Sequence, residues 1–303
     1  MDRKQLKYSL LLGLTALIWG TAFVAQSQAT DTVGPFTFNA ARLLVGGVVL
    51  LPVIRLMDTL RKRGGERAAP GSKRDLLMGG LCCGVVLFTA SAFQQAGIAY
   101  TSVGKAGFIT ALYIVLVPLT GVLIGRRIGA ALWAGVVLAV MGMYFLCMTG
   151  ETGVNRGDVL CLACALFFTM HILVIDRFSP KVDGVRLSAI QFFVAGALSF
   201  IAMLIFEKPD WSSVLAAWFP ICYAGVLSSA VGYTLQIIGQ KNVNPTLASL
   251  IMSLESVFSA LSGWIILGQT LTALEIMGCV LMFAAIILAQ LPNKNAQPKK
   301  AEE

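Results

Sequence analysis

The sequence consists of long apolar runs separated by short polar segments. A helix of about 20 apolar residues is what crosses the hydrocarbon core of a bilayer. The composition agrees, because the chain is 57% hydrophobic and only 13% charged, whereas soluble chains carry roughly a quarter charged residues. We therefore predict an all-α integral membrane protein. Its ten expected transmembrane helices lie near residues 7–26, 35–54, 75–97, 102–124, 129–148, 157–176, 185–206, 214–238, 245–266 and 272–291.

The basic residues indicate how these helices are oriented. If the N-terminus is inside, 19 of the 23 lysines and arginines fall on the inner side, as expected for cytoplasmic loops. Both termini are therefore predicted to be cytoplasmic, and residues 293–303 to form a disordered tail. The first run has the basic start of a signal peptide, but it is longer than the usual apolar core of one, so we keep it as a helix. The net charge of +8 does not indicate nucleic-acid binding, because the basic residues lie in alternate loops rather than on one face.

The two halves of the chain resemble each other. Matched pairs lie 142 to 149 residues apart, and they are Gly121 with Gly263, Gln94 with Gln236, Ala106 with Ala248, Trp19 with Phe168 and Arg42 with Gln191. Residues 1–150 and 151–292 are therefore predicted to form two repeats of five helices each. Because five is odd, the second repeat enters the membrane from the opposite side. Such inverted repeats favour alternating access to a central site.

Four side chains are expected near the bilayer midplane, about ten residues from either end of their helices. They are Trp19, Tyr113, Phe168 and Glu255, and we predict that they line a substrate site. A carboxylate at this depth is costly and usually faces a cavity or a partner. Glu255 is therefore expected to bind a cationic group of the substrate or to carry the proton that couples transport. The alternative is a packing carboxyl held by neighbouring serines or threonines.

Other polar residues extend the expected site toward the inner side. His171, Tyr233 and Gln236 are predicted to line this part, although a single histidine is as often a packing residue. Arg42 lies deep in the second helix, where an arginine requires an acid or several carbonyls, and we expect a structural ion pair rather than substrate contact. Since no basic residue is expected at the midplane, the pattern disfavours an anionic substrate.

Near the outer ends of the third and fourth helices, three polar residues are candidates for an outer gate. They are Gln94, Gln95 and Lys105. Lys105 could instead extend its ammonium group to the lipid headgroups, which we slightly favour.

The seven cysteines all fall within apolar runs. Cys161 and Cys164 have the spacing of metal ligands, but no second pair and no nearby histidine completes a site. We expect small buried thiols, with no metal, no cofactor and no disulfide framework.

Three stretches of the sequence are similar to a known family. Leu17–Phe23 in the first helix, Gly104–Thr110 with Tyr113 and Pro118 in the fourth, and Leu254–Gly268 in the ninth resemble the drug/metabolite transporter superfamily, EamA-like branch. The resemblance implies ten helices, a central cavity and transport of amino acids, related metabolites or drugs, often outward. It also implies a multi-pass protein of a bacterial inner membrane. One departure is that Arg126 and Gln269 stand where the family commonly has an acid.

We therefore predict a secondary active transporter that exports a small metabolite, such as an amino acid, an amine or a drug-like compound, by alternating access. Its expected partners are the substrate, the lipid bilayer and protons as the coupling ion, and it is expected to be a monomer or a homodimer. A lipid flippase stays open as an alternative. An intramembrane enzyme needs a nucleophile with its base or paired histidines, and the single histidine and the absence of Gly-x-Ser-x-Gly disfavour it.

Overall fold

The computed structural model describes residues 3–30, 32–63, 72–101, 103–126, 128–147, 155–268 and 271–290. Over these residues the chain is helical and contains no strand, which confirms the all-α prediction. The predicted tail, residues 293–303, lies outside the described residues.

The elements follow one another as α1 (Arg3–Thr30), α2 (Pro35–Arg63), α3 (Lys73–Ile98), α4 (Val103–Thr110), α5 (Tyr113–Leu123), α6 (Ala130–Cys147), α7 (Arg156–Phe178), η1 (Ser179–Lys181), α8 (Gly184–Phe206), α9 (Trp211–Ala216), α10 (Trp218–Tyr223), η2 (Ala224–Tyr233), α11 (Thr234–Gln240), α12 (Pro245–Met252), α13 (Glu255–Leu267) and α14 (Ala273–Gln290). In the described part of the chain, eight helical stretches are long and apolar enough to cross a membrane, while α6 and α14 are shorter apolar helices. Helices thus occupy each of the ten expected ranges. The number of crossings stays a prediction.

Two of the membrane-length stretches are interrupted in their middle. One break separates α4 from α5 at Ala111 and Leu112, and the other separates α12 from α13 at Ser253 and Leu254. The backbone passes each break with tighter hydrogen bonds between residues three apart, as in a 3₁₀ turn. A new helix therefore begins inside the protein at both places. Its first residue is Tyr113 in α5 and Glu255 in α13.

The stretch from 211 to 240 is divided into four pieces, of which η2 is a π-helix. A π-helix widens the turn and replaces the regular hydrogen bonds of an α-helix, frequently at functional sites. Within η2, the carbonyl oxygen of Ser228 accepts a hydrogen bond from the indole nitrogen of Trp19 in α1, at 3.2 Å. This bond joins α1 to the irregular turn.

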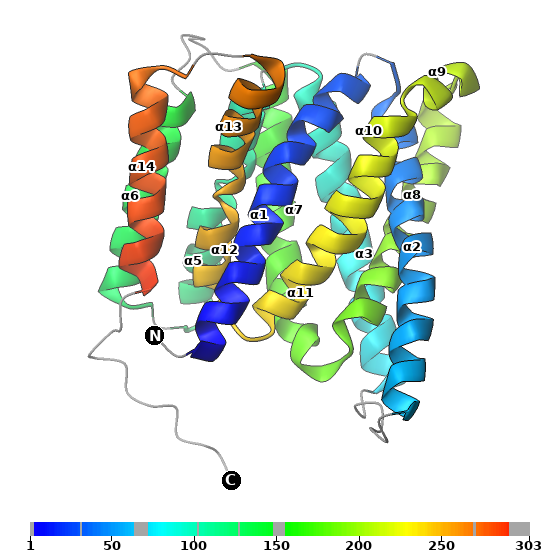
Figure 1. Ribbon diagram of the computed structural model, residues 1–303, viewed down its shortest axis with the longest axis horizontal. Helices are drawn as coiled ribbons and strands as arrows, with labels where there is room; N and C mark the ends of the chain where they lie inside the picture. Colours follow the sequence, from blue (N-terminus) through cyan, green and yellow to red (C-terminus); the bar gives the residue numbers. More distant parts are fainter. Residues whose placement is uncertain are drawn as a thin grey trace.

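The long helices pack in pairs, which can be followed in Figure 1. α6 and α14 lie side by side at one end of the molecule, α2 and α8 at the other, and α1, α7 and the broken helices stand between them. Glycine allows close approach in this middle region, because a Cβ on Gly20 of α1 would lie 2.5 Å from the Cβ of Phe258 in α13. α1 begins and α14 ends at the same face, the lower one in Figure 1.

Polar contacts connect α2 and α8 at both ends. At the lower face of Figure 1, two ion pairs join the end of α2 to the start of α8. They are Arg61–Asp183 (2.9 Å) and Arg186–Asp58 (2.7 Å). At the opposite end, the carboxylate of Glu207, which follows α8, accepts backbone N–H groups of the first turn of α2 at 2.8 Å. α2 and α8 are therefore held as one unit.

Candidate functional site

A cavity lies in the middle region, between the broken helices and α1, α2, α3, α7 and η2. It is lined by Trp19, Phe23, Gln26, Arg42, Gln94, Tyr113, Phe168, Ser228, Tyr233 and Glu255. The volume open to the centres of water-sized spheres is about 30 Å³.

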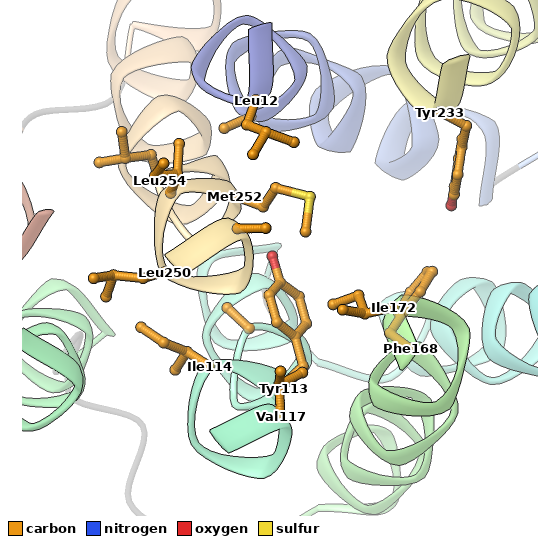
Figure 2. Close-up of a cluster of buried hydrophobic side chains, with 14 of the residues drawn as sticks. Leu12, Tyr113, Ile114, Val117, Phe168, Ile172, Tyr233, Leu250, Met252 and Leu254 are labelled. Atoms are coloured by element: carbon orange, nitrogen blue, oxygen red, sulfur yellow. The ribbon is translucent and has the colours of Figure 1, made fainter. Parts of the chain in front are cut away.

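Tyr113, the first residue of α5, and Glu255, the first residue of α13, meet across this cavity. The hydroxyl of Tyr113 donates a hydrogen bond to Oε1 of Glu255 at 2.9 Å, and only 4% of Glu255 is exposed. Figure 2 shows the ring of Tyr113 pointing from α5 toward Met252 of α12. Because Glu255 is the first residue of α13, its carboxylate also lies at the positive end of a helix dipole. The Tyr113 phenol is thus the group that holds the carboxylate.

Aromatic rings form one wall of the cavity. The rings of Trp19 and Tyr233 have their centroids 4.7 Å apart, and Phe168 of α7 lies in the same lining. Figure 2 shows Tyr233 on the side of the cluster that faces Phe168 and Ile172. Such a wall suits a flat or apolar part of a ligand.

Arg42 lies in this lining as well, and only 2% of it is exposed. Its Nε donates to Oδ1 of Asn39 at 2.8 Å, and Nδ2 of Asn39 donates to the carbonyl of Ser91 in α3 at 3.0 Å. We expected a structural ion pair, but no described carboxylate pairs with Arg42, and its Nη2 has no hydrogen-bond partner in the described structure. The expectation that no basic residue reaches the centre is therefore wrong. The reason is that an arginine extends about 7 Å beyond its backbone, so the depth of its Cα does not set the depth of its charge.

His171 and Gln236 are buried but lie outside the cavity lining. Nε2 of His171 is 3.0 Å from Oε1 of Gln191, and its ring contacts the ring of Tyr233 edge-on, with centroids 5.8 Å apart. Gln236 is 2% exposed. His171 therefore stands behind the aromatic wall, one ring away from the cavity.

The three candidate gate residues are placed differently from one another. Gln94 lines the central cavity. Gln95 donates to the backbone carbonyl of Gln26 at 3.3 Å and lines a second hollow of about 260 Å³ at the upper end of the molecule. Since Gln26 lines the central cavity, the Gln95–Gln26 contact lies between the two spaces. Lys105 belongs to α4, and its side chain lies outside the described part of the structure.

Three lining residues were not among the candidates from the sequence. Phe23 and Gln26 follow Trp19 at intervals of four and seven residues, so the helical repeat places them on the same face, and this signal could have found them. Ser228 reaches the site through the irregular geometry of η2, for which the sequence carries no comparable signal. Among the described residues, no group of three or more His, Cys, Asp or Glu side chains could hold a metal ion.

Comparison with known proteins adds to this geometry. The sequence model of a family described as the EamA-like transporter family matches residues 6–148 and 155–291. An uncharacterized transporter of Archaeoglobus fulgidus is 30% identical over 289 residues, which cover 95% of this chain and 87% of that protein. The uncharacterized inner membrane transporter YedA of Escherichia coli K12 is 23% identical over 281 residues, covering 91% and 88% of the two chains.

A solved crystal structure has a similar fold. It superposes with a TM-score of 0.74 at 21% sequence identity and covers 93% of this chain and 96% of its own. At this level of identity the likeness concerns the fold alone.

Proposed function

Because the chain belongs to the EamA-like transporter family, we propose that this multi-pass membrane transporter moves a small metabolite through the central cavity by alternating access. The observation that carries the proposal is the cavity at the two helix breaks, with Glu255 and Tyr113 bonded across it. Transport sites near broken helices at a repeat interface are characteristic of secondary transporters.

Three observations support a pair of inverted repeats, residues 1–150 and 151–292. The same family model matches two successive segments. The contacts also come in corresponding pairs, because α3 packs on α7 as η2 and α11 pack on α1, and α13 packs on α1 as α4 and α5 pack on α7. The two helix breaks lie 142 residues apart in the sequence. A two-fold axis in the membrane plane relates such repeats, and rocking about it exposes the cavity to either side in turn.

We assign the role of binding or coupling acid to Glu255. Its only direct side-chain partner in the described structure is the Tyr113 hydroxyl, which leaves Oε2 to face a ligand or accept a proton. The aromatic wall of Trp19, Phe168 and Tyr233 favours an amino acid, an amine or a drug-like compound with an apolar part. We place the protein in a cell membrane with both termini in the cytoplasm, as the charge distribution predicts. We propose export as the direction of transport.

The test is flux in proteoliposomes that contain radiolabelled amino acids or amines, with and without a pH gradient. Wild type is compared with Glu255→Gln and with Glu275→Gln, a matched control whose carboxylate only caps the first turn of α14. We expect gradient-driven flux in wild type and in the control, and its loss in Glu255→Gln. If labelled lipids cross between leaflets while none of the metabolites moves, the protein is a flippase and the proposal fails.

A further inference from the structure

Arg42 is a buried cation without a counter-ion. The ion pairs of the described residues join Arg61 to Asp183, Arg126 to Asp176 and Arg186 to Asp58, all at the helix ends near the lower face in Figure 1. None of them involves Arg42, which is 2% exposed and lines the central cavity. A buried charge without a partner is strongly destabilising, so such groups are normally paired or hydrogen-bonded. No described carboxylate meets this requirement.

The guanidinium is held in place by the protein on the side away from its free nitrogen. Asn39 binds Nε and is itself bonded to the backbone of Ser91 in α3, and the ring of Phe38 lies 5.9 Å from the Cζ of Arg42. The backbone of α2 is also fixed here, because a Cβ on Gly225 of η2 would lie 3.0 Å from the Arg42 carbonyl oxygen. With Nε occupied and Nη2 unpartnered, the end of the guanidinium is the part left for a ligand. Paired N–H groups of this kind bind a carboxylate in a planar fork.

The same lining contains one acid, Glu255. A cavity with one fixed cation, one carboxylate and an aromatic wall matches a small zwitterion, which carries both a negative and a positive group, rather than a simple amine. In the predicted repeat, the counterpart of Arg42 is Gln191, and its amide oxygen is already bonded to His171. The unpaired charge therefore belongs to the first repeat alone. As a result, the charge in the cavity does not follow the symmetry of the two repeats.

We propose that Arg42 is the anion-binding subsite of the central cavity and that it receives the carboxylate of a ligand whose ammonium group faces Glu255. Asn39 is a positioning residue for this subsite. The proposal rests on the proposed transport function and deepens it, since it makes a carboxylate a required part of the ligand.

Three probes separate the charges while they keep the same phenyl ring. They are phenylalanine, which carries both groups, 3-phenylpropanoate, which has only the carboxylate, and phenethylamine, which has only the amine. Binding at up to millimolar concentration is measured as the thermal stabilisation of the purified full-length protein. Transport of the same probes is measured in proteoliposomes. The variants are Arg42→Gln, Arg42→Lys and the control Arg55→Gln, which changes an exposed arginine of the same helix.

In wild type and Arg55→Gln, we expect both carboxylates to be bound, and phenylalanine more tightly than phenethylamine. Arg42→Gln should weaken both carboxylates about tenfold or more, as for loss of a charged hydrogen bond, and leave phenethylamine unchanged. Arg42→Lys keeps the charge but not the fork, so it should give intermediate carboxylate affinity even if Arg42→Gln fails to fold.

The proposal is overturned if wild type binds no carboxylate probe, if it binds phenethylamine at least as tightly as phenylalanine, or if the Arg42 variants leave carboxylate binding unchanged. These results are distinct from a failure of the transport function. Carboxylates that bind through Arg42 but never cross the membrane support the subsite and contradict transport. Flux of phenylalanine that is independent of Arg42 supports transport and contradicts the subsite.

Discussion

At the residue scale, the position of Glu255 follows from a break in the backbone. Leu254 ends the turn between α12 and α13, and Glu255 is the first residue of the new helix, so its side chain points into the centre rather than along a helix surface. The hydroxyl of Tyr113, which stands at the corresponding break, is its direct partner. A buried carboxylate is strongly disfavoured unless its oxygens are bonded, so the phenol and the acid act as one unit.

Replacing Tyr113 by Phe tests this unit. The change removes the hydrogen bond to Glu255 but keeps the ring, which is 3% exposed and packs in the central cluster. Loss of a hydrogen bond to a charged group costs about 1.5–3 kcal/mol. We expect stability to fall by up to this amount and substrate flux to fall about tenfold.

The control is Tyr144→Phe, which removes a hydroxyl from a half-exposed ring of α6. Thermal unfolding and proteoliposome flux check both variants. If Tyr113→Phe and Tyr144→Phe gave the same flux and the same melting temperature, the phenol would have no role in holding Glu255.

At the element scale, the contact between α1 and α13 sets the shape of the cavity. A Cβ on Gly20 would lie 2.7 Å from the carbonyl oxygen of Glu255 and 2.8 Å from the backbone nitrogen of Ser259. These are backbone atoms of the half-helix that carries the acid, so they cannot give way as a flexible side chain would. Trp19, the neighbour of Gly20, lines the cavity from the same helix. The absence of a side chain at Gly20 therefore places two site residues close together.

Gly20→Ala should destabilise the protein by about 1–3 kcal/mol, the usual cost of overpacking, and reduce flux because α13 must shift. Gly13→Ala in the same helix is a matched control, since its Cβ would meet nothing within 4 Å and alanine is the better helix former by up to about 1 kcal/mol. Thermal unfolding in detergent distinguishes them. Equal melting temperatures for the two variants would mean that α1 and α13 do not pack as described.

The helices could be predicted from the sequence because the bilayer imposes a length of about 20 apolar residues on each of them. The interruptions at Leu112 and Leu254 could not, since hydropathy does not respond to backbone geometry. The π-helical turn at Ser228 could not be predicted for the same reason. The depth of Trp19, Tyr113, Phe168 and Glu255 was predictable from the rise of the helix, and the structure brings all four into one cavity.

The depth of a residue along its helix does not predict how far a long side chain extends or which residues it contacts. Arg42 was assigned to a structural ion pair because it lies deep in its helix, yet no described carboxylate pairs with it and it lines the cavity. His171 has a suitable depth, but it is turned toward Gln191 of α8. Which way a side chain leaves its helix depends on neighbouring helices, and a single sequence does not reveal their order around the cavity.

At the scale of the whole molecule, the packing divides the helices into two kinds. The pairs α6–α14 and α2–α8 stand at the two ends, and α2–α8 is tied at both of its own ends by ion pairs and by the cap from Glu207. Between them, the broken helices surround the central cavity. If transport proceeds by alternating access, these central helices are the ones that we expect to move.

Alternating access requires that one cavity open to the two sides of the membrane in turn, and chemical labelling at Gln94 measures this. A Gln94→Cys variant is made in a background whose seven native cysteines are replaced, and a membrane-impermeant maleimide is added to right-side-out and to inside-out vesicles. Ala197→Cys, on the exposed surface in the middle of α8, serves as the control that stays unreacted. We expect the cysteine at position 94 to be modified from either side, and a transported substrate to slow both reactions. Modification from one side only, or from neither, would contradict alternating access through this cavity.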